Sequence, residues 1–149
     1  MEIERTLAAP GPPEVLFRHV EDLSRYPVWM SLIHSVSELD PDPNGVRAWD
    51  VELRARVGPL ARSKRLRMVR TTHDAPRAVV FERAELDGRS HAPWVLRAEL
   101  STPAMAADEV GLTMTLSYGG ALWTGAVLQR VLDDEVQLAS EALLQLVSP

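Results

Sequence analysis

The chain contains no cysteine and only four histidines among its 149 residues. Disulfide bonds, thiolate zinc sites and cysteine nucleophiles are thereby excluded, and the composition fits a reducing compartment. The histidines show neither the H-x-H nor the H-E-x-x-H spacing of a metal site. No serine lies in a Gly-x-Ser-x-Gly setting, so the sequence offers no hydrolase nucleophile. We therefore expect neither a metal nor another cofactor.

Long hydrophobic runs are lacking as well. No stretch approaches the roughly 20 uninterrupted apolar residues that a membrane-spanning helix needs. The N-terminus, residues 1–13, alternates in polarity and has no apolar core of the kind found in a secretory signal. We therefore expect a cytoplasmic protein without a membrane span.

Positive charge is in the minority. The chain has 16 lysine and arginine residues against 21 aspartate and glutamate residues, which gives a formal net charge of -5. A general nucleic-acid-binding protein needs a basic face to displace counterions, so we expect no nucleic-acid partner. Lys64 is the only lysine. With 46% hydrophobic and 25% charged residues, the composition is that of an ordinary globular protein, and the length suits one domain spanning residues 1–149.

Alternation of apolar and polar residues runs through most of the chain. This period of two is typical of half-buried β-strands. Turn signals such as Asp40–Gly45, Gly58-Pro59 and Asp87-Gly88 separate the alternating segments. We expect strands over Met1–Leu7, Ile33–Leu39, Val46–Val57, Leu60–Thr71, Val79–Leu86, Trp94–Leu100 and Leu112–Tyr118.

Helical spacing occurs in three places. A short helix is predicted over Glu14–Val20, and a second through Tyr26–Met30 with Asp22 or Ser24 as its cap. The third segment, Ala121–Val147, contains no proline and predicts one amphipathic helix of about 27 residues, roughly 40 Å long. Its apolar positions recur at intervals of three and four: Gly125, Leu128, Leu132, Val136, Ala139, Leu143 and Leu146.

These elements predict an α+β, helix-grip architecture. A curved antiparallel sheet of about six to seven strands would wrap around the long C-terminal helix, because only that helix is large enough to cover the apolar face of the sheet. The two short helices near the N-terminus would close one end. The space left between sheet and helix would then form a pocket.

The segment Val20–Trp29 resembles a known family signature. It matches the pattern V-x-D-L/I/V-x-x-Y/W-P-x-W, and it follows a first strand that ends in Ala9-Pro10. On these residues the chain is similar to the START/Bet v 1-like (SRPBCC) superfamily, and within it to bacterial polyketide cyclase/dehydrase-like members. The order of elements extends the resemblance over essentially the whole chain. The resemblance implies a cavity that holds lipids, sterols, polyketides or other hydrophobic compounds.

Candidate ligand-binding residues lie at the end of the Tyr-Pro segment and on the inward faces of the strands and helix. Large aromatic, methionine and aliphatic side chains suit the wall of an apolar pocket. The set is Tyr26, Trp29, Met30, His34, Trp49, Leu53, Arg62, Arg65, Trp94, Leu96, Met114, Tyr118, Leu128 and Leu132. The alternative is structural: the aromatic residues of the Tyr-Pro segment would pin the short helices onto the sheet, and the strand residues would fill a core.

The strand Leu60–Thr71 is unusually basic. Alternation places Leu66 and Met68 on its inner face, and Arg62 and Lys64 share that parity unless a bulge near Ser63 shifts the register. An inward arginine would bind a carboxylate or polarise a carbonyl of a ligand.

The resemblance implies a cavity arginine on about this strand, with Arg65 or Arg67 as the nearest match. The alternative is a solvated outer face paired with Asp50, Glu52 and Glu82 on neighbouring strands.

Two functions and one further role remain open from the sequence. The first is non-catalytic binding of a small apolar molecule. The second is a polyketide cyclase/aromatase-like enzyme, for which His34, Tyr118, Arg62 and Arg65 are the available acid, base or cationic groups; no catalytic residue is assigned. The third is protein interaction, which would require a closed core and an exposed apolar patch. The apolar helix end, Leu143–Val147, would suit contact between two copies in a homodimer.

Overall fold

The computed structural model describes residues 1–57, 59–101, 108–119 and 126–148. Its strands are β1 (Glu2–Pro10), β2 (Ile33–Leu39), β3 (Ala48–Val57), β4 (Leu60–Asp74), β5 (Ala78–Arg83), β6 (Trp94–Ser101) and β7 (Glu109–Tyr118). Its helices are α1 (Pro13–Val20), the 3-10 helix η1 (Leu23–Val28) and α2 (Ala126–Val147).

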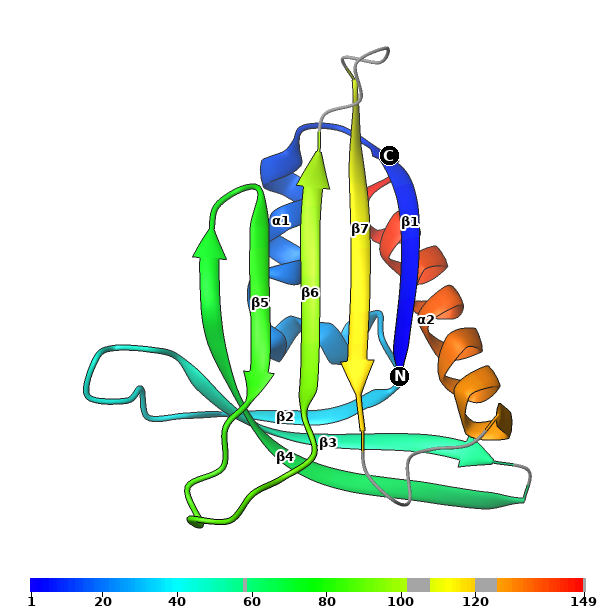
Figure 1. Cartoon of the computed structure of the whole chain (residues 1–149). Helices are drawn as coiled ribbons and strands as arrows, with labels where there is room; N and C mark the ends of the chain where they lie inside the picture. Colours follow the sequence, from blue (N-terminus) through cyan, green and yellow to red (C-terminus); the bar gives the residue numbers. More distant parts are fainter. Residues whose placement is uncertain (58, 102–107, 120–125, 149) are drawn as a thin grey trace.

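All seven strands form one antiparallel sheet in the order β1-β7-β6-β5-β4-β3-β2. In Figure 1, strands β5, β6, β7 and β1 stand upright, whereas β2, β3 and the lower part of β4 pass beneath them, so the sheet curves strongly. Helix α2 runs along the inner side of this curve and packs mainly against β1 and β3. The predicted helix-grip class is confirmed, with the second short helix in 3-10 rather than α form.

The buried stripe of α2 has the predicted helical spacing. Leu132, Val136, Ala139 and Leu143 are all at most 3% exposed. Leu146, predicted to continue the stripe, is 44% exposed. Leu143 is buried in the core, so the apolar helix end exposes less surface for a homodimer contact than the sequence predicts. The expected helix start at residues 121–125 lies outside the described residues.

The register of β4 settles which of its side chains face inward. The ladder between β3 and β4 is unbroken from Ala48 opposite Val69 to Val57 opposite Leu60, so there is no bulge at Ser63. The register shifts instead between Arg70 and Thr72, on the other edge of β4.

Leu66 and Met68 are buried on the concave face, as alternation predicts. The inward-facing Arg70 donates a hydrogen bond to the carbonyl of Glu21, at the C-terminus of α1, over 2.9 Å.

Strand β5 ends earlier than predicted. Alternation extends to Leu86, but the strand stops at Arg83 and a longer connection leads to β6. The cause is Glu85, whose carboxylate accepts hydrogen bonds from the Arg83 Nε and the Arg67 backbone N–H, each over 3.0 Å. Leu86 is 80% exposed, and the turn signal Asp87-Gly88 lies within the connection between Arg83 and Trp94.

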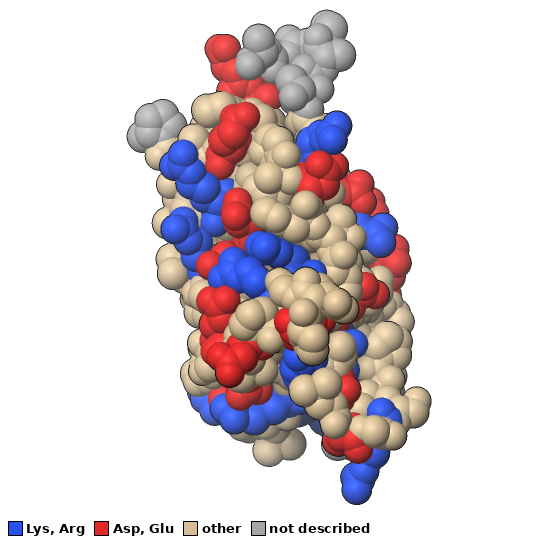
Figure 2. Space-filling view, turned by 90° about the vertical axis from the view of Figure 1, so that its left-hand side faces the viewer, with Lys and Arg blue, Asp and Glu red and all other residues tan. Residues whose placement is uncertain are grey.

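Acidic and basic side chains are intermingled over the face shown in Figure 2. Among the described ion pairs, Arg47 donates two hydrogen bonds of 2.9 Å to the Glu38 carboxylate and lies 3.4 Å from the Asp22 carboxylate. Its guanidinium group also stacks 4.9 Å from the centre of the Trp49 ring. Further pairs join Arg65 to Asp50, Arg77 to Asp74, and Arg97 to Glu99. Exposed pairs of this kind contribute little stability each.

The Val20–Trp29 segment forms a tightly bonded corner between α1 and the sheet. Asp22 caps η1 by accepting the Ser24 N–H over 2.9 Å, as one of the two predicted caps. Tyr26 is fully buried, and its hydroxyl donates to the Val20 carbonyl over 2.8 Å. The residues of the signature therefore hold their own backbone together.

Replacing Asp22 tests this corner through its pH dependence. Burial would raise the pKa of the Asp22 carboxyl, but the Ser24 N–H and the charge of Arg47 outweigh it and hold the pKa below its ordinary value. A depressed folded pKa adds stability above the unfolded pKa, and this stability is lost as pH falls through the folded pKa. We expect Asp22→Ala to lower the unfolding free energy by about 1 kcal/mol at neutral pH. Asp22→Asn removes only the charge, so urea unfolding should show that its unfolding free energy falls below that of the wild type at neutral pH and approaches it in acid. A difference in unfolding free energy that does not change with pH would contradict the role of the Asp22 charge.

Candidate functional site

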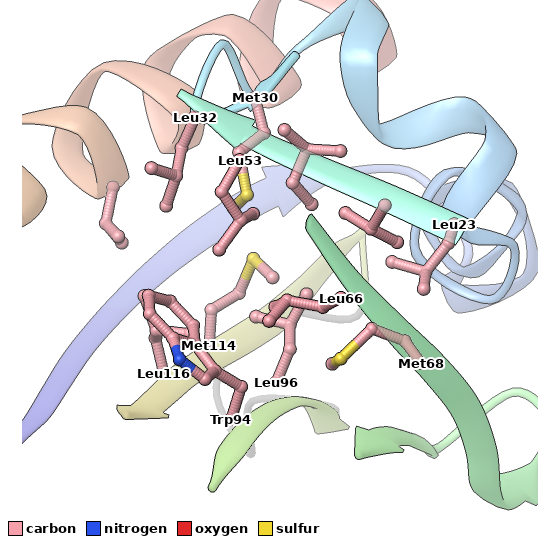
Figure 3. A pocket seen from close by; sticks show the side chains of 13 residues that line it. Leu23, Met30, Leu32, Leu53, Leu66, Met68, Trp94, Leu96, Met114 and Leu116 are labelled. Carbon is pink, nitrogen blue, oxygen red and sulfur yellow. The ribbon is translucent and has the colours of Figure 1, made fainter. Parts of the chain in front are cut away.

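An apolar cavity lies between the concave face of the sheet and α2. It is lined by 13 residues from η1, the following turn, five strands and the middle of α2 (Figure 3). They are Leu23, Met30, Leu32, Ile33, Val51, Leu53, Leu66, Met68, Trp94, Leu96, Met114, Leu116 and Val136. Strands β3, β4, β6 and β7 each contribute two residues spaced two apart, because alternate side chains share one face of a sheet. The lining therefore consists of hydrocarbon, thioether and indole groups.

The cavity is narrow as the side chains stand. The space inside it that is open to the centre of a water molecule measures only about 30 Å³. Cavities that bury a drug-sized ligand usually measure about 300–1,000 Å³. Binding of such a ligand therefore requires the lining side chains to move apart. Met30, Met68 and Met114 point into this space, and methionine adapts its shape more readily than branched residues do.

Five of the predicted ligand-binding residues meet at this cavity. They are Met30, Leu53, Trp94, Leu96 and Met114. Met30 follows η1, and the other four lie on β3, β6 and β7, where the alternating pattern of each strand directs the side chain inward.

Three predicted aromatic residues are anchors beside the cavity and do not line it. Tyr26 packs edge-on against Phe81 with ring centroids 5.8 Å apart. Trp29 packs 4.6 Å from Tyr26, and its indole N–H donates to the His19 carbonyl over 3.2 Å. Trp49 donates to the Ser24 hydroxyl over 3.2 Å and is fully buried. These contacts match the structural alternative, in which the aromatic residues pin the short helices onto the sheet.

Tyr118 and Leu132 are buried but lie outside the lining. Tyr118 packs against Trp94 with ring centroids 5.3 Å apart, and burial raises the pKa of its hydroxyl. Within the described part of the chain this hydroxyl has no hydrogen-bond partner. Leu132 fills the core on α2. The side chain of Leu128 lies outside what the structure describes.

The structure does not bring the predicted polar residues to the cavity. His34 is exposed, because the register of β2 shifts between Ile33 and Ser35 and turns the intervening side chain outward. Arg65 is 67% exposed on the convex face and lies 3.6 Å from Asp50, as the solvated-face alternative predicts. Arg62 has the inward parity but lies toward the end of the β3–β4 hairpin, where its side chain is exposed.

A family model confirms the resemblance. The model described as polyketide cyclase / dehydrase and lipid transport matches residues 9–144 of the chain. The chain belongs to this polyketide cyclase/dehydrase family. All the residues that line the cavity fall inside the matched stretch, which makes the cavity part of a ligand-binding domain of the SRPBCC type. No curated protein matches the sequence.

Solved structures share the fold of this family member. A START superfamily protein from Mycobacterium smegmatis is 15% identical, with a TM-score of 0.71, and the alignment covers 98% of this chain and 96% of that one. The Zhui aromatase/cyclase from a Streptomyces species is 13% identical, with a TM-score of 0.69, and the alignment covers 99% of this chain and 93% of that one. At such identities the likeness shows the fold alone.

Several residues of the family member's cavity were absent from the sequence-based set. The alternating pattern already placed four of them on inward strand faces, so their position in the pattern could have identified them as lining residues: Val51, Leu66, Met68 and Leu116. Leu32 lies in the turn that follows η1, and Ile33 begins β2. Nothing in their spacing indicates that they line a cavity.

Arg83 is a further inward residue that the sequence analysis missed. It lies opposite the cavity-lining Met68, and its side chain is only 10% exposed. It donates to the Glu85 carboxylate over 3.0 Å and to the Ala92 carbonyl over 3.3 Å. Its parity with the buried Phe81 on β5 was the signal that would have found it.

No group of three or more histidine, aspartate or glutamate side chains among the described residues is placed to hold a metal ion. No helix in the described part of the chain is both long and apolar enough to cross a membrane.

Proposed function

We propose that the chain, as one domain over residues 1–149, binds a small hydrophobic molecule between the sheet and α2 without acting on it chemically. The observation that carries this proposal is the lining of the cavity. None of the described residues that line it has an ionisable or hydroxyl group. A wall of this composition gains affinity by removing apolar surface from water, at about 25 cal/mol per Å².

The cavity's small size fits a ligand that enters by displacing flexible side chains. Three of the lining residues are methionines, and they come from the turn after η1, from β4 and from β7. Their movement would open space on three sides of the same volume. A lipid chain or a slender polyketide would suit this cavity better than a rigid polycyclic compound, because it fills a narrow, irregular space.

The cyclase/aromatase-like alternative has less support. Cyclisation with loss of water needs an acid or base beside a group that stabilises negative charge. The residues available for it, His34, Tyr118, Arg62 and Arg65, lie outside the cavity lining. The family description and the fold shared with an aromatase/cyclase support cyclisation as the alternative function. In the described part of the chain, no residue that lines the cavity is an acid or base that could catalyse it.

Native mass spectrometry of the protein purified from its own host tests the binding function. We expect an added mass of a small lipid-like or polyketide-like molecule that disappears when the protein is denatured. The proposal would be contradicted by the absence of any such mass together with the absence of a thermal shift across a panel of lipids and polyketides.

A further inference from the structure

Lys64 occupies the border between the apolar cavity and solvent. It lies on β4 directly opposite Leu53 and two residues before Leu66, and both of these line the cavity. Residues two apart on a strand share a face at a separation of about 7 Å. The Lys64 side chain therefore leaves the sheet on the cavity side, within reach of the space between Leu53 and Leu66.

Exposure rises in steps along this inner row of β4. Met68 and Leu66 are buried, Lys64 is half-buried, and Arg62 is exposed. The concave face thus passes from apolar wall to water over only a few inward positions. A ligand lying along this row would contact carbon at one end and a cation at the other.

The charges around Lys64 do not balance. Within the described part of the chain, its ammonium group makes no hydrogen bond or ion pair. The negative charge that acts on it is that of Glu85, but this carboxylate already accepts hydrogen bonds from Arg83 and from the Arg67 backbone. Burial, and then the charge of Arg83, lower the pKa of Lys64 below its ordinary value. The group of Lys64, Arg83 and Glu85 therefore has two positive charges and one negative charge.

We propose that the ligand is an amphipathic anion, with its apolar chain in the cavity and its acidic head group on Lys64. This inference rests on the proposed binding function and adds the chemical class of the ligand. A carboxylate at Lys64 would supply the missing opposite charge and a charge-assisted hydrogen bond. A neutral head group would leave the half-buried ammonium group uncompensated. The competing role of Lys64 is to cover the cavity edge with its methylene groups alone.

Decanoate and decanol are the probes that separate these roles, because they share a chain and differ in head-group charge. Isothermal titration calorimetry would measure both against the wild type, Lys64→Met and Lys64→Arg. Arg65→Met is the matched control: it removes the same charge from the next residue, whose side chain lies on the convex face. Thermal unfolding would establish that each variant is folded.

We expect Lys64→Met to weaken decanoate binding by about tenfold or more, which is about 1.4 kcal/mol. Decanol binding should change by less than about twofold, and Lys64→Arg should retain most of the decanoate affinity. Arg65→Met should leave both probes nearly unaffected, because an exposed charge contributes little at physiological salt.

The inference is overturned if Lys64→Met and Arg65→Met lower the affinity for decanoate equally. It is also overturned if decanoate binds no more tightly than decanol and its affinity does not change in Lys64→Met. In those cases decanol binding still supports the hydrophobic cavity, so the proposed function stands alone. If neither probe binds the wild-type protein, the binding function fails and the inference fails with it.

Discussion

Val136→Phe is expected to reduce decanol affinity at least tenfold, which is about 1.4 kcal/mol of binding free energy. Val136 lines the cavity from the middle of α2 and is 3% exposed. A phenyl ring at this position projects toward the sheet and takes up the space between β3, β4 and β7. Because the open space there is only about 30 Å³, little room would remain for a ligand.

The same substitution elsewhere provides the control for this result. Val28→Phe makes an identical chemical change at a residue that is 73% exposed and outside the cavity lining. Its decanol affinity should equal that of the wild type. Overpacking a core costs about 1–3 kcal/mol, so Val136→Phe should remain folded in thermal unfolding. Unchanged decanol binding by a folded Val136→Phe protein would place the binding site elsewhere.

Trp49→Ala is expected to lower the unfolding free energy by about 3–5 kcal/mol. Trp49 is fully buried, packs edge-on against Phe81 with centroids 5.4 Å apart, and holds Arg47 over its ring. Its indole N–H also bonds the Ser24 hydroxyl, so the substitution loosens η1 from the sheet. Such a loss is a large part of the about 5–15 kcal/mol that stabilises a typical domain.

Urea unfolding measures this loss, and a milder variant separates stability from binding. Trp49→Phe keeps an aromatic ring in the core and should lower stability by less than Trp49→Ala. Its decanol affinity should match the wild type, because Trp49 does not line the cavity. If Trp49→Phe is stable but binds decanol much more weakly than the wild type, Trp49 contributes to the ligand site and its placement outside the lining is wrong.

Sequence periodicity predicted the faces of the strands but not the depth of each residue. Trp49 and Leu53 share one face of β3, yet only Leu53 reaches the cavity. The difference arises from the curvature of the sheet and from where η1 covers it. Both are set by contacts between segments distant in sequence, which no local pattern contains.

Irregular register accounts for the other differences. His34 is among the ligand-binding residues predicted from the sequence. In the structure the register between β2 and β3 shifts between Ile33 and Ser35, and the His34 side chain is exposed. Conversely, the absence of a bulge at Ser63 leaves Lys64 on the cavity side. Bulges depend on how neighbouring strands pair, so their positions had to come from the structure.

Methionine methyl groups report directly on the central claim, that an apolar molecule binds between the sheet and α2. Met30, Met68 and Met114 line the cavity, whereas Met1 is 46% exposed at the N-terminus. In an NMR titration of methyl-labelled protein with decanol, the three cavity methionine signals should shift together and saturate at one concentration, while the Met1 signal stays in place. If decanol leaves the three cavity signals unmoved, or shifts Met1 instead, the account of the cavity is wrong.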